Sequence, residues 1–248
     1  MIFKKKNKIE FFSKIPGVAE TFPIIPTSKF KPKWVEACKN DFIRNKGSKQ
    51  PSHLQLCPGI FEVYKYGYVV PMWHDVTIKT FRDREDFEAG TPSKHLNEMY
   101  NGEVVGTHPY EITKWLPKRP YSKHAFVKLN TPWHVIAPPG VKFLVIPIPY
   151  ADNYDYESAI GILDPSVSTE VNIQAYWNVN EGERKIFAGT PMMQLVPISE
   201  KSFDLDVRDA TEHDKIWLDK RTYIYIFGYK VDKAKMKEAY LKHFGGKK

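Results

Sequence analysis

The eight histidines are the residues of this sequence best suited to hold a metal ion. None stands in an H-x-H, H-x-x-x-H or H-E-x-x-H spacing, which would place two imidazoles of one element on one ion. Separate strands could still bring ligands together, so the weak candidates for a metal site are His74, His108 and His134. Ordinary polar or half-buried histidines are the favoured interpretation, and we expect no cofactor.

The cysteines and glycines of the sequence form no motif of a catalytic nucleophile or of a phosphate-binding loop. Cys38 and Cys57 are the two cysteines, and they form no C-x-x-C pair, so we expect reduced thiols in a reducing compartment. Cys57 precedes Pro58-Gly59 and is predicted to be a small buried residue at a turn. The Gly-rich motifs that bind nucleotide phosphates do not occur. The sequence therefore contains no complete set of catalytic groups.

Four tryptophans could form a platform for a nucleotide or a sugar. Their spacing along apolar segments favours packing between sheets instead; they are Trp73, Trp115, Trp133 and Trp177.

Short apolar segments separated by Gly, Pro, Asn and Asp dominate the middle of the chain. Aromatic residues are 14 % of the 248 residues and prolines number 19, which favours strands over helices. The pattern predicts strands at 57–63, 68–72, 76–81, 126–129, 133–137, 143–148, 160–163, 171–177, 185–188 and 193–197, and a loop at 83–106. Spaced apolar residues predict helices at 33–44 and 232–244, the second with Asp232 as N-cap and Gly245-Gly246 as stop.

These elements predict a mainly β protein, with a jelly-roll or β-sandwich core, an N-terminal arm and a C-terminal helical segment. We expect three parts: a basic N-terminal arm with a short helix at 1–54, a β core domain at 55–200, and a C-terminal helical extension at 201–248. No apolar stretch has the length of a membrane span and the start lacks a secretion signal, so we expect neither membrane insertion nor secretion.

Six motifs together resemble an uncharacterised family of tailed-phage proteins, over roughly residues 55–200. They are Cys57-Pro-Gly-Ile-Phe, Gly67-Tyr-Val-Val-Pro-Met-Trp-His-Asp, His108-Pro-Tyr-Glu, Leu129-Asn-Thr-Pro-Trp-His-Val, Pro138-Pro-Gly and Gly189-Thr-Pro-Met-Met-Gln-Leu-Val-Pro. The resemblance implies a bacteriophage source, with the host cytoplasm or the virion as location, and it implies no particular reaction.

A second resemblance concerns the end of the predicted core. Gly161-Ile-Leu-Asp164 and Gly189-Thr-Pro-Met-Met-Gln194-Leu-Val are similar to the closing segments of the dUTPase and dCTP-deaminase fold. That resemblance implies a jelly roll, and it implies that Asp164 occupies the position of the water-activating aspartate. The aromatic residue expected after this aspartate is absent, because Pro165-Ser166 follows. Asp-Pro-Ser is also a ready turn former, which favours a structural Asp164.

Charge divides the chain into basic ends and an acidic middle. Residues 1–50 carry twelve Lys and Arg against four acids (+8), and residues 230–248 carry seven against two (+5), so the remainder is 8 − 8 − 5 = −5. The Lys-rich termini could bind an anionic partner or serve only as solubilising tails. We expect a homo-oligomer, since β folds of this kind abut edge strands.

The leading hypothesis is therefore a phage-encoded, non-enzymatic structural or interaction protein, associated with the virion or its assembly and contacting other phage structural proteins. The alternative is a dUTPase-fold protein that binds or hydrolyses nucleotides through Asp164. A weaker alternative is a metal-dependent cupin-like enzyme or oxygenase that uses the scattered histidines.

Overall fold

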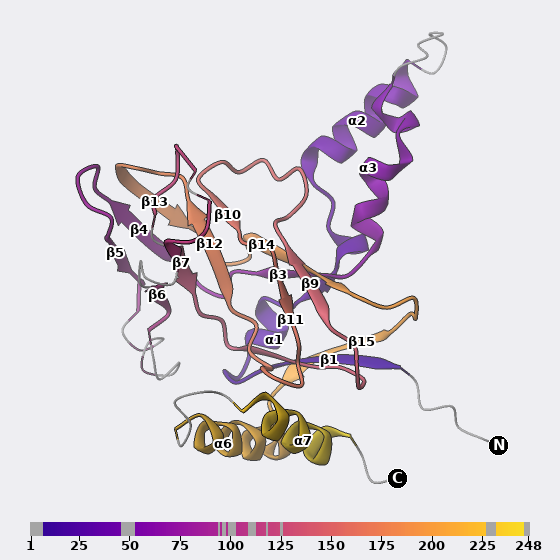
Figure 1. Ribbon diagram of the computed structural model, residues 1–248. Coiled ribbons are helices and arrows are strands. Elements are labelled where there is room, and N and C mark those ends of the chain that lie inside the picture. Colours follow the sequence, from indigo (N-terminus) through magenta and orange to yellow (C-terminus); the bar gives the residue numbers. More distant parts are fainter. Residues whose placement is uncertain are drawn as a thin grey trace, which may run out of the picture.

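A computed structural model describes residues 7–45, 53–93, 95, 98, 103–108, 113–117, 119–124, 126–226 and 232–245. It shows a mixed α/β protein with more strand than helix, several antiparallel sheets and two helices at the C-terminal end (Figure 1). No helix in these ranges is long and apolar enough to cross a membrane.

Two larger antiparallel sheets form the centre of the molecule. The five-stranded sheet has the order β11 (Gly161–Leu163), β9 (Phe143–Ile146), β14 (Pro191–Pro197), β3 (Tyr68–Pro71) and β2 (Ile25–Pro26). The four-stranded sheet has the order β10 (Tyr156–Ser158), β12 (Ile173–Trp177), β7 (Phe126–Leu129) and β6 (Val105–His108).

Two three-stranded sheets flank this centre. One has the order β13 (Gly182–Ile186), β4 (Val76–Thr80) and β5 (Phe87–Gly90). The other has the order β15 (Asp204–Asp209), β1 (Lys8–Ser13) and β8 (Trp133–Ile136), and its β1–β15 pair is parallel.

The antiparallel pairs are nested along the chain. Strand β3 pairs with β14, β4 with β13, β7 with β12, and β9 with β11. Along the chain, the two strands of each pair therefore stand on either side of the two strands of the next pair.

One apolar core lies between the sheets. It receives alternate residues of the strands, because successive side chains of a strand point to opposite faces. In β12, for example, Ile173, Ala175 and Trp177 are buried. Strand β1 contributes Ile9 and Phe11 to the same core.

Four of the helices lie at two ends of the molecule (Figure 1). Helices α2 (Lys33–Arg44) and α3 (Pro58–Glu62) extend away from the sheets, and α6 (Glu212–Ile226) packs beside α7 (Lys233–Phe244) near β1 and β15. The shorter helical turns are α1 (Val18–Thr21), η1 (Thr27–Lys29), η2 (Leu54–Leu56) and η3 (Val63–Lys65).

Several predicted elements are confirmed. Both predicted helices form, α2 over the whole predicted range, and the Asp232 carboxylate caps α7 by accepting from the backbone N–H groups of Ala234 and Lys235. Strands also form within or overlapping the predicted segments from 68–72 onward. Gly246 lies outside the described residues.

Two predicted segments are wrong. Residues 57–63 form α3 and the start of η3, since Pro58 fits the first turn of a helix. The predicted loop at 83–106 contains strand β5, which pairs with β4. The predicted C-terminal helical extension at 201–248 contains helices α6 and α7, and strand β15 precedes them. Because β15 and β1 share a sheet with β8, the predicted arm, core and extension are joined in one sheet.

Candidate functional site: a tyrosine-lined cavity

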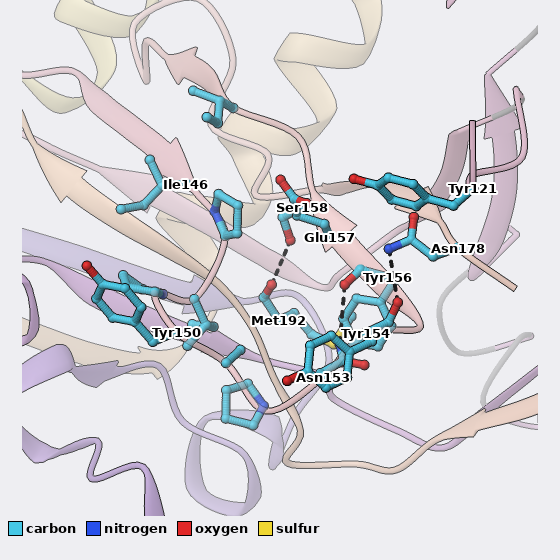
Figure 2. A pocket seen from close by; sticks show the side chains of 16 residues that line it. Tyr121, Ile146, Tyr150, Asn153, Tyr154, Tyr156, Glu157, Ser158, Asn178 and Met192 are labelled. Atoms are coloured by element: carbon cyan, nitrogen blue, oxygen red, sulfur yellow. Dashed lines mark hydrogen bonds between the residues drawn. The ribbon is translucent and has the colours of Figure 1, made fainter. Parts of the chain in front are cut away.

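A cavity of 640 Å³ opens beside strand β10 (Figure 2). Its walls come from the loop after β9, from β10, from the start of β14, and from two further loops. The lining residues are Tyr121, Ile146, Pro147, Ile148, Pro149, Tyr150, Ala151, Asn153, Tyr154, Tyr156, Glu157, Ser158, Ile160, Asn178, Pro191 and Met192. The volume is typical of a site for a small molecule or a short peptide segment.

Three tyrosines around this cavity present their rings to solvent. Tyr121 is 55 % exposed, Tyr150 is 59 % and Tyr154 is 82 %. Figure 2 shows the rings spread around the cavity, on different sides of it. Exposed tyrosines combine a large rigid apolar face with a hydroxyl group, which makes them effective contact residues.

The loop that carries Tyr150 is held in a strained backbone conformation. Tyr150 has φ of 51°, in the left-handed region that non-glycine residues rarely adopt. Two aromatic side chains fix this loop: the indole Nε1 of Trp34 donates to the Tyr150 carbonyl at 3.1 Å, and the Tyr64 hydroxyl donates to the Pro149 carbonyl at 2.5 Å. Such strain persists where the surroundings hold it, and it is concentrated at binding and catalytic sites.

The next turn of the cavity wall is fixed as well. The Asn178 side-chain amide donates to the Tyr154 carbonyl at 3.0 Å, and the Asn153 side-chain oxygen accepts from the Asp155 N–H at 3.1 Å. Tyr156 is buried and its ring stacks on Trp177. The exposed tyrosines therefore project from a rigid support.

Glu157 is the charged side chain of the lining, and it is already neutralised. Arg119 donates two hydrogen bonds to its carboxylate, at 2.6 and 2.9 Å, and the same guanidinium lies 3.8 Å from the Tyr176 ring centroid. This contact with Glu157 raises the pKa of Arg119, and it outweighs the partial burial of Arg119, which lowers that pKa. Ser158 donates to the Met192 carbonyl at 2.6 Å. The arrangement favours binding through ring faces rather than proton transfer.

Asp164 lies in a turn after β11, where its contacts stabilise the fold. Its carboxylate accepts from the Ser166 N–H at 3.1 Å and from the Ser166 hydroxyl at 2.5 Å. Lys142 and Lys237 each place their ammonium group 3.6 Å from it. Burial raises the pKa of this carboxyl, but the Ser166 bonds and the two lysines outweigh burial and lower it. Asp164 thus connects its turn to helix α7.

We expect Asp164→Asn to lower the free energy of unfolding by at most about 1 kcal/mol, because the amide still accepts from the Ser166 N–H while the two ion pairs are lost. Neither protein should release phosphate or pyrophosphate from deoxynucleotides with Mg²⁺. Urea unfolding and a phosphate-release assay test both points, with Ser166→Ala as the matched control of the turn. Turnover by the wild type that Asp164→Asn abolishes would instead establish a catalytic aspartate.

The three candidate metal-binding histidines lie apart in the fold. His134 is on β8, His108 ends β6, and His74 lies between β3 and β4, so two different sheets and a loop carry them. Within the described part of the chain, no group of three or more His, Cys, Asp or Glu is placed to hold a metal ion. The structure therefore does not bring these three residues together.

Two of these histidines are buried, and each makes a polar contact through its Nδ1 atom. The Nδ1 atom of His134 lies 2.9 Å from the Thr169 hydroxyl, its ring stacks on Phe12, and burial lowers its pKa to about 3. His74 contacts the Asp75 carbonyl through Nδ1 at 2.6 Å, and burial lowers its pKa too.

Other predicted roles have mixed outcomes. Packing is confirmed for Trp73, Trp133 and Trp177, which are buried, whereas Trp115 is 83 % exposed. Gln194, in the segment similar to the end of the dUTPase fold, is buried, and its side-chain amide donates to the Val63 and Tyr66 carbonyls. The prediction for Cys57 is wrong: its side chain is exposed, because residues 57–62 form an exposed helical turn and not a buried strand.

The tyrosine cavity itself is absent from the sequence-based predictions. A signal existed in residues 150–156, Tyr-Ala-Asp-Asn-Tyr-Asp-Tyr, where three tyrosines alternate with turn-forming Asp and Asn. Tyr121 is distant from these residues in sequence, and only the fold brings it to the same cavity.

Comparisons with known proteins add no relative to this description: no protein-family model, no curated protein and no solved structure matches the chain.

Proposed function

We propose that this chain is a non-enzymatic interaction protein of the tailed-phage family it resembles, acting in the host cytoplasm or the virion through the tyrosine-lined cavity. One observation carries the proposal. A cavity of 640 Å³ presents three exposed tyrosines, whereas the candidate catalytic residue Asp164 and the candidate metal ligand His134 make contacts that stabilise the fold. Tyrosine-rich rigid surfaces are typical of protein recognition.

A jelly-roll core is part of the same proposal. The four nested antiparallel pairs support it, because winding one long hairpin onto itself produces pairs that enclose one another. The short strands and the absence of parallel pairs among these eight strands agree with that topology.

Two further features belong to the proposal as predicted from the sequence. The first is a closed homo-oligomer. The second is an anionic partner for the Lys-rich termini, of which residues 1–6 and 246–248 lie outside the described ranges. Both are compatible with a protein that works by contacts in an assembly.

Site-specific photo-crosslinking tests the proposed surface. A benzophenone amino acid at position 154 should yield one discrete protein adduct in infected cells, because the Tyr154 ring projects from the cavity wall. The matched control places the same amino acid at Ile216, which is 59 % exposed on helix α6. Adducts at both positions alike, or at position 216 only, would contradict the proposed surface.

Activity decides between this proposal and its alternatives. Hydrolysis of deoxynucleotides that depends on Asp164 would favour the dUTPase-fold alternative. Metal-dependent oxidation that depends on His74, His108 or His134 would favour the cupin-like one. The proposal expects turnover in neither assay.

A further inference from the structure

Helix α7 covers the end of strand β8 through the side chain of Tyr240. Residues 169–171 bond to β8 as far as Val135, whose N–H donates to the Thr169 carbonyl at 2.8 Å. At Ala137 the Tyr240 hydroxyl takes over: it accepts from the Ala137 N–H at 3.0 Å and donates to the Ala137 carbonyl at 3.1 Å. Both residues are buried, so departure of α7 would leave both backbone groups of Ala137 free to bond water or another strand.

Two stacked histidines join the C-terminal end of α7 to the start of α6. His213 stands in the first turn of α6 and His243 in the last turn of α7, and their ring centroids lie 3.9 Å apart with 16° between the planes. The His243 Nε2 atom lies 2.9 Å from the His213 carbonyl oxygen. Because a carbonyl only accepts, Nε2 carries a proton, and Nδ1 is the atom that can take up a second one.

The carboxylates beside this stack are already paired with cations. Asp214 accepts from the Arg208 guanidinium, and the Glu212 carboxylate lies 2.6 Å from the Lys215 ammonium group. Two imidazolium rings stacked as His213 and His243 are would therefore repel each other with little compensation.

The surroundings of His243 also oppose its protonation. Burial lowers the pKa of His243, and the positive charges of His213 and Lys220 lower it further. These effects outweigh the bond to the His213 carbonyl and the Asp214 carboxylate, which raise that pKa. Lys242, the neighbour of His243 on α7, is basic as well. The closed stack thus takes up a proton less readily than an open chain, whose histidines titrate near pH 6.5, so acid favours the open form below that pH.

We propose that α7 is a pH-sensitive cover of the end of β8, held closed by the His213–His243 stack and released when both imidazoles are protonated. Release begins at the C-terminal end of α7, where the stack lies, and reaches Tyr240 one turn earlier, which uncovers Ala137. The start of α7 stays in place, because Lys237 pairs with Asp164 at 3.6 Å and the pKa of this carboxyl is lowered, so that it remains charged in mild acid. The cover is separate from the proposed function, since none of these residues lines the tyrosine cavity.

Hydrogen exchange of the full chain at pH 7.5 and 5.5, followed by NMR and corrected for the intrinsic rate, tests this cover. The amides of residues 238–244 and of Ala137 should exchange about tenfold faster or more at pH 5.5, as one proton taken up over one pH unit below 6.5 requires. The amides of β12 and β14 should change less than about twofold.

Two variants remove the titration in different ways. His213→Phe keeps a ring in the stack but cannot be charged, and it alters an exposed position. His243→Gln keeps a donor for the His213 carbonyl. Both should lose the acceleration at pH 5.5. His95→Asn, at an exposed histidine, is the matched control and should keep it, and His134→Asn should keep it too, because His134 acts on global stability.

Four results overturn the inference. The first is unchanged exchange of residues 238–244 in the wild type at pH 5.5. The second is acceleration that persists in both His213→Phe and His243→Gln, with circular dichroism at pH 7.5 showing that both are folded. The third is equal acceleration of β12 and β14, which would mean global destabilisation. The fourth is acceleration of residues 238–244 while Ala137 stays protected, which would mean fraying of a helix end without uncovering of β8.

Discussion

Arg208→Ala is expected to lower the free energy of unfolding by about 3–5 kcal/mol, because it leaves a buried carboxylate without its charged partner. Asp214 is 1 % exposed, and the Arg208 guanidinium donates to both of its oxygens, at 2.5 and 3.3 Å. The same guanidinium donates to Glu10 on β1 at 3.0 Å. Arg208 therefore connects β15, β1 and the start of helix α6.

The effect should depend on pH in a defined direction. Burial raises the pKa of Asp214, but hydrogen bonds from Arg208 and Thr211 outweigh burial and lower it. A carboxyl with a lowered folded pKa stabilises the fold above its unfolded pKa of about 3.9, and this stabilisation is lost as the pH falls below that value. The difference between wild type and Arg208→Ala should thus shrink in acid.

Urea unfolding at pH 7 and at pH 3.5 measures both differences. Arg184→Ala is the matched control, since Arg184 pairs with Asp155 on the surface, where such pairs contribute about 0–1 kcal/mol. Equal losses for the two variants at pH 7 would contradict the structural role assigned to Arg208.

Local patterns predicted some elements fully and others not at all. Helix α2 matches its predicted range because Trp34, Cys38 and Phe42 recur every four residues. The same pattern could not show that α2 has no fully buried residue and extends from the sheets. Periodicity reports an apolar face, whereas its partner depends on folding.

Helix α6 lies in the predicted helical extension at 201–248, but its bounds were not predicted, although its start carries a recognisable signal. Thr211-Glu-His-Asp214 is a capping box: Thr211 accepts through its hydroxyl from the Asp214 N–H, and Asp214 accepts from the Thr211 N–H. Strand β15 gave a weaker signal, because four of its six residues are charged, and its pairing with β1 joins residues almost the whole chain apart.

The candidate site was the least predictable part. The residue types that perform chemistry are His74, His108, His134 and Asp164, yet the described part of the chain gathers no three possible metal ligands and uses Asp164 in a turn. Tyr121, Tyr150 and Tyr154 become neighbours of one cavity only when β10 and the loops around it are placed. The feature that reveals them, exposed aromatic surface on a rigid support, exists only in three dimensions.

Acid is expected to destabilise this protein through His134 between about pH 6.5 and 3. The folded state lowers the pKa of this imidazole from 6.5 to about 3, first through burial and then through the positive charges of Arg221 and Lys14, against the opposing effect of Glu170 and Asp214. Below pH 6.5 the unfolded chain therefore binds a proton that the folded chain does not. Stability is full above pH 6.5 and falls by up to about 1.4 kcal/mol per pH unit as the pH decreases.

His134→Asn removes this titration, because an amide does not take up a proton in this pH range. The amide can still reach the Thr169 hydroxyl, which contacts Nδ1 of His134 and accepts a hydrogen bond from the Trp217 indole. The variant should be less stable at pH 7, because a buried ring stacked on Phe12 is lost. Between pH 6.5 and 4.5 the wild type should lose about 2–3 kcal/mol more of its unfolding free energy than the variant loses. His95→Asn, at an exposed histidine, should keep the wild-type slope. Parallel curves for the wild type and His134→Asn would show that His134 accepts a proton in the folded protein as readily as in the unfolded chain.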